Sequence, residues 1–498
     1  MSQACQALRR PFAVAGCVVA LAGCDGLLDV ELPSQLTDQA LNDPNSAADQ
    51  VNSAIAHFEC GYSTFAYWIG GAEDVMDPQG AVYYASGAHV YDPFPNSGDC
   101  DQTPQAVAFY SQFTVTSAMA RSVYDLMNGE GGWTDAEVPN KQQLSTISAL
   151  YSAATLEWFG ELFCEMTVDE GPLMTPDQTL SLADEWVGRA LGHISTSGDF
   201  PMPHEITPGP GGAEALAYAL RSRILWAQGD LVGAAEAARM VPQGFEARVT
   251  RGGGLTRRNK VYQQGTETRY ASVAGVNDWW GGLPNPATGA AWPEVIPFTG
   301  YLHLGILPDG RAVRDDGLPV RVDGPYRTTA EDAAVADSRV PVEFSNALQG
   351  GGTGYVPVKY TSDSDPIPFV NWEEIWLIRA EAEGGQAAID LVNEIRAAHD
   401  LPLVSYADPS DAAQIRQMIL EEKRRSLWLE ARYIATKIQN TDLVWFPRAQ
   451  GTTPSQGVQY LGGVRMLMPN DEFDLNENIS RTDRATGCAE GQRPVQFQ

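Results

Sequence analysis

The sequence predicts a mainly α-helical protein built on paired helices, with long loop-rich insertions between the pairs. Apolar residues recur at helical spacing in 213–241 and again in 371–398, and a glycine turn divides each stretch. Across 243–370 this spacing disappears, and Gly, Pro, Asp and Asn turn signals become dense. We therefore expect a discontinuous scaffold of tetratricopeptide-like helix pairs that carries a large loop-rich face.

The first predicted hairpin lies at 213–241. Leu220 and Ile224 follow one face of a helix, and Gly229-Asp230 supplies a tight turn. A second helix follows, in which small residues such as Ala234 let two helices approach closely. This plan of helix, turn and small-residue helix is typical of a tetratricopeptide-like hairpin.

The second predicted hairpin lies at 371–398. Asn371 begins its first helix, Gly384-Gly385 breaks it, and apolar residues resume at i, i+1, i+4 and i+7 from Ala388. A further amphipathic run begins at Asp411. The two hairpins are about 160 residues apart, whereas a tandem array stacks repeats of about 34 residues directly. One interrupted scaffold is therefore favoured over separate domains.

Turn signals and apolar spacing predict which of the other segments are helical and which are loops. Asn42-Asp43-Pro44 predicts a helix start, and helical patterning returns after residue 105. The scaffold is predicted mainly at 42–58, 102–242 and 371–440. Loop-rich insertions are predicted at 60–101 and 243–370, and the chain beyond 440 is predicted to be mostly loop.

The N-terminus has the pattern of a lipoprotein signal peptide. A basic pair, Arg9-Arg10, precedes an apolar stretch at 12–22, and Leu21-Ala22-Gly23-Cys24 resembles a bacterial lipobox. We expect residues 1–23 to be removed and Cys24 to be lipidated, leaving one domain over 24–498. A transmembrane anchor is the alternative, but spanning a bilayer needs about 20 apolar residues.

Charge and cysteine content narrow the classes of partner. The chain carries a formal net charge of −30, which disfavours nucleic acid and anionic membrane surfaces. Outside the cytoplasm the cysteines left after processing are expected in disulfides, and none has the two-residue spacing of a zinc site. Three pairings are possible, and the favoured one joins Cys60 to Cys100 and Cys164 to Cys488.

Most catalytic motifs are missing from the sequence. No nucleophile elbow or phosphate loop occurs, and the six histidines are scattered, so no metal or cofactor is predicted. Carboxylates gather around Glu73-Asp74 and Asp77 and again at 471–474, which keeps a glycoside hydrolase as an alternative. The run 474–478 has oxygen ligands on alternate residues but lacks the glycine and distal glutamate of a calcium loop, so a polar loop is favoured.

Aromatic residues in the predicted loops are the main candidates for ligand binding. They fall among Gly, Pro, Asp and Asn instead of on helical stripes, and Trp68 belongs to the same set. A flat ring can stack on the C–H face of a sugar while nearby polar groups bind its hydroxyls. The alternative is that the rings are satellite core residues that hold long loops in place. The predicted stacking residues are Trp279, Trp280, Trp292, Tyr83, Tyr84 and Tyr91, with Asp92, Asn96 and Asp99 as polar partners.

Several blocks in the same order resemble the SusD/RagB-like outer-membrane nutrient-binding lipoproteins. The resemblance covers essentially the whole mature length, and its matching blocks lie at 24–33, 36–44, 367–382, 388–396, 419–430 and 467–476. The chain departs from the family after Glu430, where the family usually has glycine and this chain has Ala431.

This resemblance implies four tetratricopeptide-like helix pairs with a loop-rich ligand face. It also implies a non-catalytic lipoprotein on the outer-membrane surface, which binds oligosaccharides and passes them to a TonB-dependent, SusC-like transporter. The blocks that match are scaffold, so the ligand residues above rest on the aromatic argument alone. Two other functions stay open: a helical-repeat scaffold lipoprotein that binds protein or peptide partners, and a glycoside hydrolase.

Overall fold

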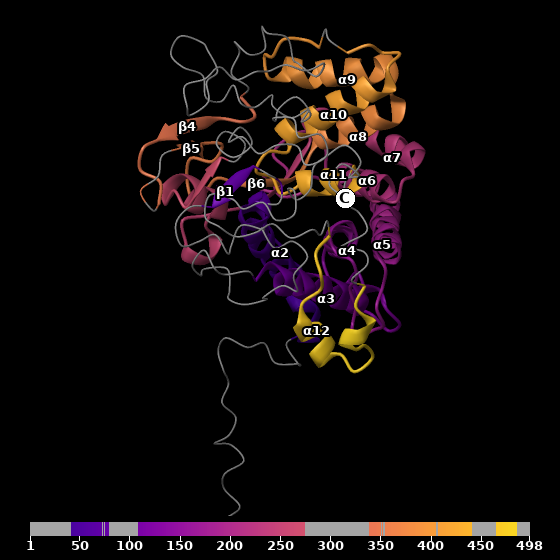
Figure 1. Ribbon diagram of the computed structural model, residues 1–498. Helices are drawn as coiled ribbons and strands as arrows, with labels where there is room; N and C mark the ends of the chain where they lie inside the picture. Colours follow the sequence, from indigo (N-terminus) through magenta and orange to yellow (C-terminus); the bar gives the residue numbers. More distant parts are fainter. Residues whose placement is uncertain are drawn as a thin grey trace, which may run out of the picture.

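The computed structural model describes residues 41–71, 73, 75–78, 108–273, 338–349, 351, 354–404, 407–440 and 465–485. These residues form a mainly helical fold, as the sequence predicts (Figure 1). The longer helices are α2 (Ala47–Trp68), α3 (Phe109–Asn128), α4 (Lys141–Leu162), α5 (Pro176–Ser197), α6 (Ala213–Ala227), α7 (Leu231–Ala238), α8 (Trp372–Glu383), α9 (Gly385–Ala398) and α10 (Ala412–Ser426). Shorter ones are α11 (Tyr433–Gln439) and α12 (Asn470–Leu475), with 3-10 turns η1 (Pro44–Ser46) and η2 (Ile69–Gly71).

Helices α2 to α5 pack as successive neighbours in the lower half of the fold (Figure 1). Helix α4 is buried almost all round, so it lacks the exposed stripe that marks a surface helix. It approaches α5 closely at Gly160, where an added Cβ would lie 2.6 Å from Leu180 Cγ. Helix α5 begins with a capping box, in which Thr175 and Gln178 bind each other's backbone N–H groups.

Both predicted hairpins form, and they pack against each other through α7 and α8. Gly229 adopts a φ of +83°, and the Asp230 side chain accepts the Gly233 N–H at 3.0 Å to cap α7. In the second hairpin, Asn371 Oδ1 accepts the Glu374 N–H at 2.9 Å, and Gly384 has a φ of +63°. The prediction of one discontinuous scaffold is therefore confirmed.

The insertion between the hairpins begins and ends at a shared pair of strands. Strand β2 (Glu246–Val249) pairs antiparallel with β6 (Ile367–Asn371), with Glu246 opposite Asn371 and a bulge at Ala247/Arg248. Other short strands follow within the insertion, namely β3 (Ala271–Val273), β4 (Val342–Ser345) and β5 (Gly354–Pro357), together with η4 (Leu255–Arg257) and a π-helical turn η5 (Tyr262–Glu267).

One predicted boundary is wrong. Residues 60–68 continue α2 instead of forming loop, and Trp68, expected among the loop aromatics, is 4% exposed in that helix. The segment is buried on every side, so it carries no amphipathic spacing to recognise. The amphipathic run predicted from Asp411 forms α10, which stops at Ser426, and the chain then turns at Leu429 (φ +59°) and Ala431 (φ +60°) before α11.

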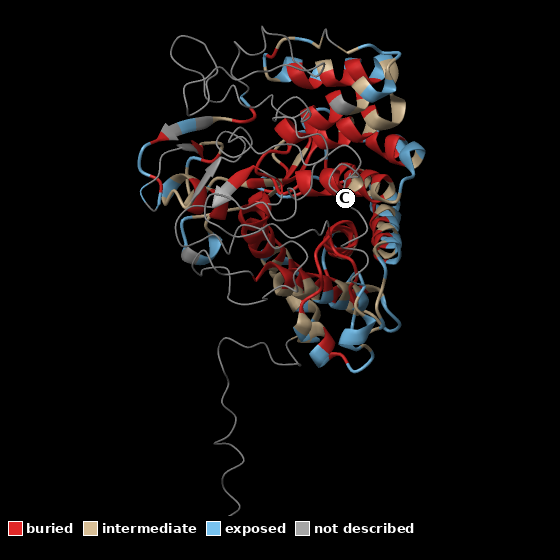
Figure 2. Ribbon diagram, viewed as in Figure 1, coloured by how far each residue is buried: buried red, intermediate tan, exposed pale blue. Residues whose placement is uncertain are grey.

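The pattern of buried and exposed residues matches the packing of the helices (Figure 2). Buried residues fill most of α4 and the C-terminal halves of α2 and α10, whereas exposed residues lie along the outer faces of α5, α7 and α9. Within the described ranges, no helix has both the length and the apolarity needed to cross a bilayer.

Candidate functional site

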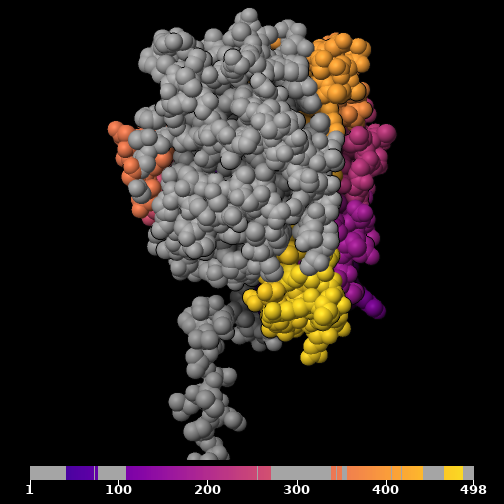
Figure 3. Space-filling model, in the orientation of Figure 1, coloured from indigo at the N-terminus to yellow at the C-terminus, as the bar shows by residue number. Residues whose placement is uncertain are grey.

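Four short strands form a platform at one edge of the molecule. Strand β1 (Met76–Pro78) pairs antiparallel with β3, with Met76 opposite Val273 and Pro78 opposite Ala271. Strand β4 pairs with β5, and β5 packs against β3 and the π-helical turn. We call β1, β3, β4, β5 and η5 the strand platform. In Figure 3 the surface of β4 and β5 lies at the edge opposite that of α7 and α9.

Both predicted ligand-binding insertions continue from this platform. The chain leaves β1 at Pro78 and leaves β3 at Val273, and because these strands are antiparallel the two exits lie at opposite ends of one three-residue ladder. Tyr83 is five residues beyond Pro78, and Trp279 is six beyond Val273. The predicted ligand residues Trp279, Trp280, Trp292, Tyr83, Tyr84, Tyr91, Asp92, Asn96 and Asp99 all lie outside the described residues.

A buried glutamate fixes the chain that leads to the platform. Glu59 of α2 is 3% exposed and accepts the Thr250 N–H at 2.7 Å and the Thr250 hydroxyl at 2.6 Å. Its other oxygen lies 3.2 Å from an Arg257 guanidinium nitrogen and 3.7 Å from Arg251. Burial lowers the pKa of Arg251 to about 10, although Glu59 opposes that change. This carboxylate therefore joins α2 to the loop 250–257.

A second anchor lies at Asn259. Its backbone N–H donates to Asp363 O at 2.9 Å and its side-chain amide to Asp365 O at 2.8 Å, while its side-chain oxygen accepts the Tyr262 N–H at 3.0 Å. The Asp365 carboxylate in turn accepts hydrogen bonds within the turn 361–365, and although partial burial opposes them, these bonds lower its pKa. The π-helical turn is therefore held at its first residue.

A third anchor ties β5 to the turn after α10. Lys359 Nζ lies 2.7 Å from Glu430 Oε1 and donates to Trp428 O at 2.8 Å. Asn371, the cap of α8, donates to the other Glu430 oxygen at 2.6 Å. Burial raises the pKa of Glu430 to about 7, and Lys359 opposes this rise. The turn and the platform are thereby joined through one buried carboxylate.

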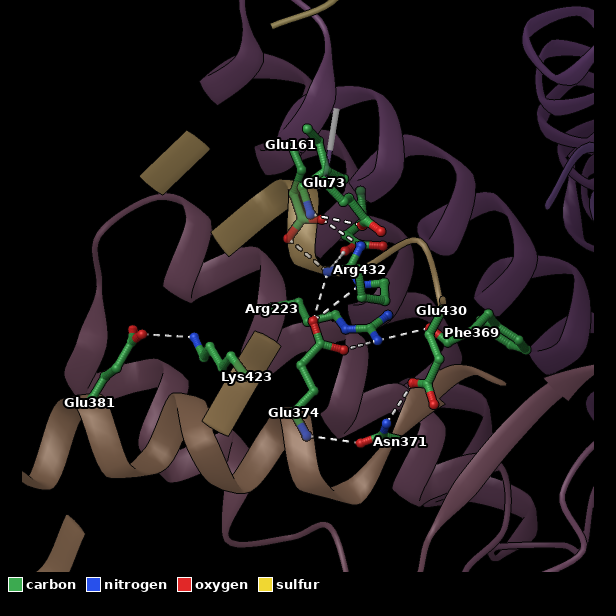
Figure 4. A network of polar contacts seen from close by, with 12 residues as sticks. Glu73, Glu161, Arg223, Phe369, Asn371, Glu374, Glu381, Lys423, Glu430 and Arg432 are labelled. Carbon is green, nitrogen blue, oxygen red and sulfur yellow. Dashed lines mark hydrogen bonds and ion pairs between the residues drawn. The ribbon is translucent and has the colours of Figure 1, made fainter. Parts of the chain in front are cut away.

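A buried ionic network centred on Arg432 holds the scaffold behind these anchors (Figure 4). Arg432 lies 2.7 Å from Glu161, 3.0 Å from Glu374 and 3.3 Å from Glu157. Glu374 also pairs closely with Arg223, which donates to the Phe369 carbonyl at 2.8 Å. The network thus joins α4, α6, β6 and α8 with the turn that precedes α11.

The charges in this network favour one protonated acid. Burial opposes ionisation of Glu374, yet Arg223 and Arg432 outweigh it and lower its pKa. Burial and the neighbouring Glu161 raise the pKa of Glu157 well above its ordinary value. A buried ion is tolerated only where it is paired, so we infer that Glu157 holds a proton.

The sequence keeps a glycoside hydrolase as an alternative because of two groups of carboxylates. Among the described side chains, these carboxylates do not form a catalytic pair. Glu73 is fully buried, and Asp474 forms an exposed ion pair with Arg481. Glu472 is near Thr167 at the α12 end of the fold, and its pKa is raised by burial. No group of three or more His, Cys, Asp or Glu side chains within the described ranges is arranged to hold a metal ion.

A pair of cavities lined by described residues lies away from the strand platform. One, of about 510 Å³, lies between the two hairpin turns and is lined by Trp226, Glu381 and the glycines at 229, 384 and 385. Lys423 lies over the Trp226 ring at 4.1 Å and binds Glu381 at 2.8 Å, so it links two of the side chains that line this cavity. The other, of about 580 Å³, lies beside the Arg121–Asp169 ion pair.

Cys60 and Cys164 each form a disulfide. Cys100, Cys488 and the predicted lipidation site Cys24 lie outside the described residues. The pairing of Cys60 with Cys100 and of Cys164 with Cys488 therefore stays a prediction.

Solved structures with the same arrangement of helix pairs identify the fold. A SusD homolog from Bacteroides thetaiotaomicron VPI-5482 matches with a TM-score of 0.57 and 11% identity, over 88% of this chain and 97% of that one. A SusD-like carbohydrate binding protein from Bacteroides vulgatus ATCC 8482 matches with a TM-score of 0.56 and 12% identity, over the same shares. This chain has the SusD-like fold.

A third structure with the SusD-like fold contains a ligand. Surface glycan-binding protein A from Bacteroides thetaiotaomicron, in complex with laminarihexaose, matches with a TM-score of 0.53 and 13% identity, over 87% of this chain and 98% of that one. No protein-family model and no curated protein matches the sequence.

Proposed function

We propose that this SusD-like protein is a non-catalytic lipoprotein of the SusD/RagB type that binds oligosaccharides through the two insertions on the strand platform. The observation that carries the proposal is the β1–β3 ladder, because the two segments richest in loop aromatics leave the scaffold from this single pair of strands. Residues far apart in sequence can then contribute to one ligand face. A fold shared with a protein that holds laminarihexaose supports the choice of a sugar.

The proposed ligand residues are those that the sequence predicts. Trp279, Trp280, Trp292, Tyr83, Tyr84 and Tyr91 would stack on sugar rings, and Asp92, Asn96 and Asp99 would bind hydroxyls. Three buried anchors, Glu59, Asn259 and Glu430, hold the strands and turns next to these segments. A site built on rigid neighbours loses less conformational entropy when ligand binds, which favours affinity.

Isothermal titration calorimetry against a panel of neutral oligosaccharides, with laminarihexaose included, tests whether the ligand is a sugar. The proposal is supported if the wild type binds an oligosaccharide and the double variant Trp279→Ala/Trp280→Ala binds it with an affinity at least tenfold lower. Trp133→Ala is the matched control, because this partly buried tryptophan lines the cavity beside Arg121. Peptide binding with no response to any oligosaccharide would rule out the sugar.

The lipobox-like N-terminus supports a proposed lipid anchor, and the SusD-like fold supports a proposed transporter partner. We propose that Cys24 is diacylated, that the domain 24–498 sits on the outer-membrane surface, and that it delivers glycan to a TonB-dependent, SusC-like transporter. Cys24→Ser should move the protein from the membrane fraction to the soluble fraction. Co-purification with an outer-membrane transporter from mild detergent tests the partner, and protease treatment of intact cells tests surface exposure.

A protein-binding scaffold is the second candidate function. Leu231 and Val232 of α7 are 39% and 72% exposed, next to the cavity between the hairpin turns. Apolar exposure beside a cavity is typical of a protein-binding surface. A Val232→Arg variant that loses binding to a peptide library, in a protein that binds no oligosaccharide, would favour this function. Release of reducing ends from the oligosaccharide panel would instead favour the hydrolase.

A further inference from the structure

Glu73 occupies the short connection between α2 and the strand platform. Its backbone N–H donates to Ile69 O at 3.0 Å, and the Val75 N–H donates to Gly70 O at 3.0 Å. Strand β1 begins three residues after Glu73 and pairs with β3. A movement of this side chain would therefore disturb the β1–β3 ladder, from which both insertions leave the scaffold.

The Glu73 side chain is enclosed and only half satisfied. It is 0% exposed, and its Oε1 accepts the Ile434 N–H at 2.9 Å. Its Oε2 is buried without a hydrogen-bond partner among the described residues. An ionised carboxylate carries charge on both oxygens, so it would leave part of that charge without solvent or partner, whereas a neutral acid avoids this cost.

The charged groups around Glu73 come from α11 and from the residue that precedes it. Lys437 and Arg432 favour its ionised form, as do the backbones of Ile434 and Tyr433. Arg432 is already shared with Glu161, Glu157 and Glu374, and Figure 4 shows Glu73 at the Glu161 end of this network. Burial outweighs these groups and raises the pKa of Glu73 to about 8.

We propose that Glu73 is a protonated latch, which holds the strand platform on the α11 end of the scaffold near neutral pH and loosens when it ionises. Loss of the proton places in the interior a charge that Lys437 and Arg432 compensate only in part, and the side chain must then move toward water. Because η2 and β1 flank this residue directly, that movement disturbs the β1–β3 ladder. The effect on ligand affinity rests on the proposed glycan function, but the latch itself does not.

The direction of the pH effect follows from the raised pKa. An unfolded chain ionises this carboxyl near 4.5, whereas the folded protein holds the proton to about pH 8. The contribution of Glu73 to stability is therefore fully present below pH 4.5 and is lost progressively as the pH rises to about 8. Within the folded protein, the latch itself ionises only near the upper end of this window.

Hydrogen exchange on the full chain tests the latch without any ligand. We compare the wild type with Glu73→Gln, which keeps the shape and is neutral at every pH, at matched values between pH 7 and 9. Dividing the two rates at each pH cancels the intrinsic pH dependence of exchange. Amides of 76–77 and 271–273 should exchange at similar rates in both proteins at pH 7, and at least threefold faster in the wild type at pH 9.

Glu472→Gln is the matched control, because Glu472 is another glutamate whose pKa burial raises, but it lies on α12. This variant should follow the wild type at every pH. Equal β1–β3 exchange in the wild type and in Glu73→Gln at pH 9 would overturn the latch. So would a Glu73→Gln variant that is already faster at pH 7, because the neutral form would then not be the closed one.

Titration with laminarihexaose at pH 7 and pH 9 tests whether the latch affects ligand affinity. The wild type should lose affinity at pH 9, whereas Glu73→Gln should keep it. If neither protein binds the sugar at either pH, the glycan proposal fails while the exchange result still decides the latch. If both proteins bind equally at both pH values, the latch has no influence on the ligand site.

Discussion

Arg432 and Glu161 are 271 residues apart in the sequence, yet they form a two-pronged ion pair whose side chains are 2% and 1% exposed. The same guanidinium also contacts Glu374. One side chain therefore joins the helices of the N-terminal half to the second hairpin. We expect this contact to be a main determinant of stability.

Arg432→Met should destabilise the protein by about 3–5 kcal/mol, because it leaves buried carboxylates without their cation. Arg481→Ala is the control: it breaks an exposed pair with Asp474, and solvent screens such a pair so that it contributes little to stability. Guanidinium unfolding followed by circular dichroism measures both. Equal effects of the two substitutions would show that the buried network does not hold the halves together.

Ala431 adopts a left-handed backbone conformation, with a φ of +60°, at the position where the SusD/RagB-like pattern has glycine. This conformation costs a non-glycine residue about 1–2 kcal/mol, which glycine avoids. Ala431→Gly should therefore be about 1–2 kcal/mol more favourable than Ala435→Gly, a matched change at a buried alanine inside α11. Equal free energies of unfolding for the two variants would contradict the strain.

Glu430 predicts a second pH dependence. Its pKa is raised by burial to about 7, from an ordinary value of 4.5. Its contribution to stability is thus present below pH 4.5 and is lost as the pH rises to about 7. Across this window, the melting temperature of Glu430→Gln should change less with pH than that of the wild type. A difference between the two proteins that is constant from pH 4 to 8 would mean that Glu430 does not titrate there.

Disulfide mapping tests the predicted pairing. Mass spectrometry of a non-reduced digest should find Cys60 joined to Cys100 and Cys164 joined to Cys488. Removing either bond by a Cys→Ser pair should cost about 2–4 kcal/mol. A peptide that joins Cys60 to Cys488 would contradict the predicted connectivity.

Local signals made the scaffold predictable from sequence. The turn at Gly229, the cap at Asn371 and the break at Gly384 each depend on a residue whose conformation or hydrogen bonding is local, and all three form where the sequence places them. The end of α2 was missed because Trp68 and its neighbours are buried all round. A helix without an exposed face has no amphipathic period to read.

The buried network could not be predicted because it depends on contacts between distant segments. Glu157 and Glu161 are four residues apart on α4 and resemble a solvent-facing stripe, yet they are 2% and 1% exposed. Only the packing of four elements brings Arg432 between them. Glu73 was noted as part of a carboxylate cluster, but its enclosure depends on α11, about 360 residues further along the chain.

We propose that the aromatic residues of the two insertions that follow β1 and β3 bind a sugar. Isothermal titration of laminarihexaose and related neutral oligosaccharides into the wild type and into Trp279→Ala/Trp280→Ala tests it most directly. We predict saturable binding by the wild type and a loss of at least tenfold in affinity in the double variant, with Trp133→Ala unchanged. Wild-type affinity in the double variant, or equal losses in both variants, would contradict the assigned site.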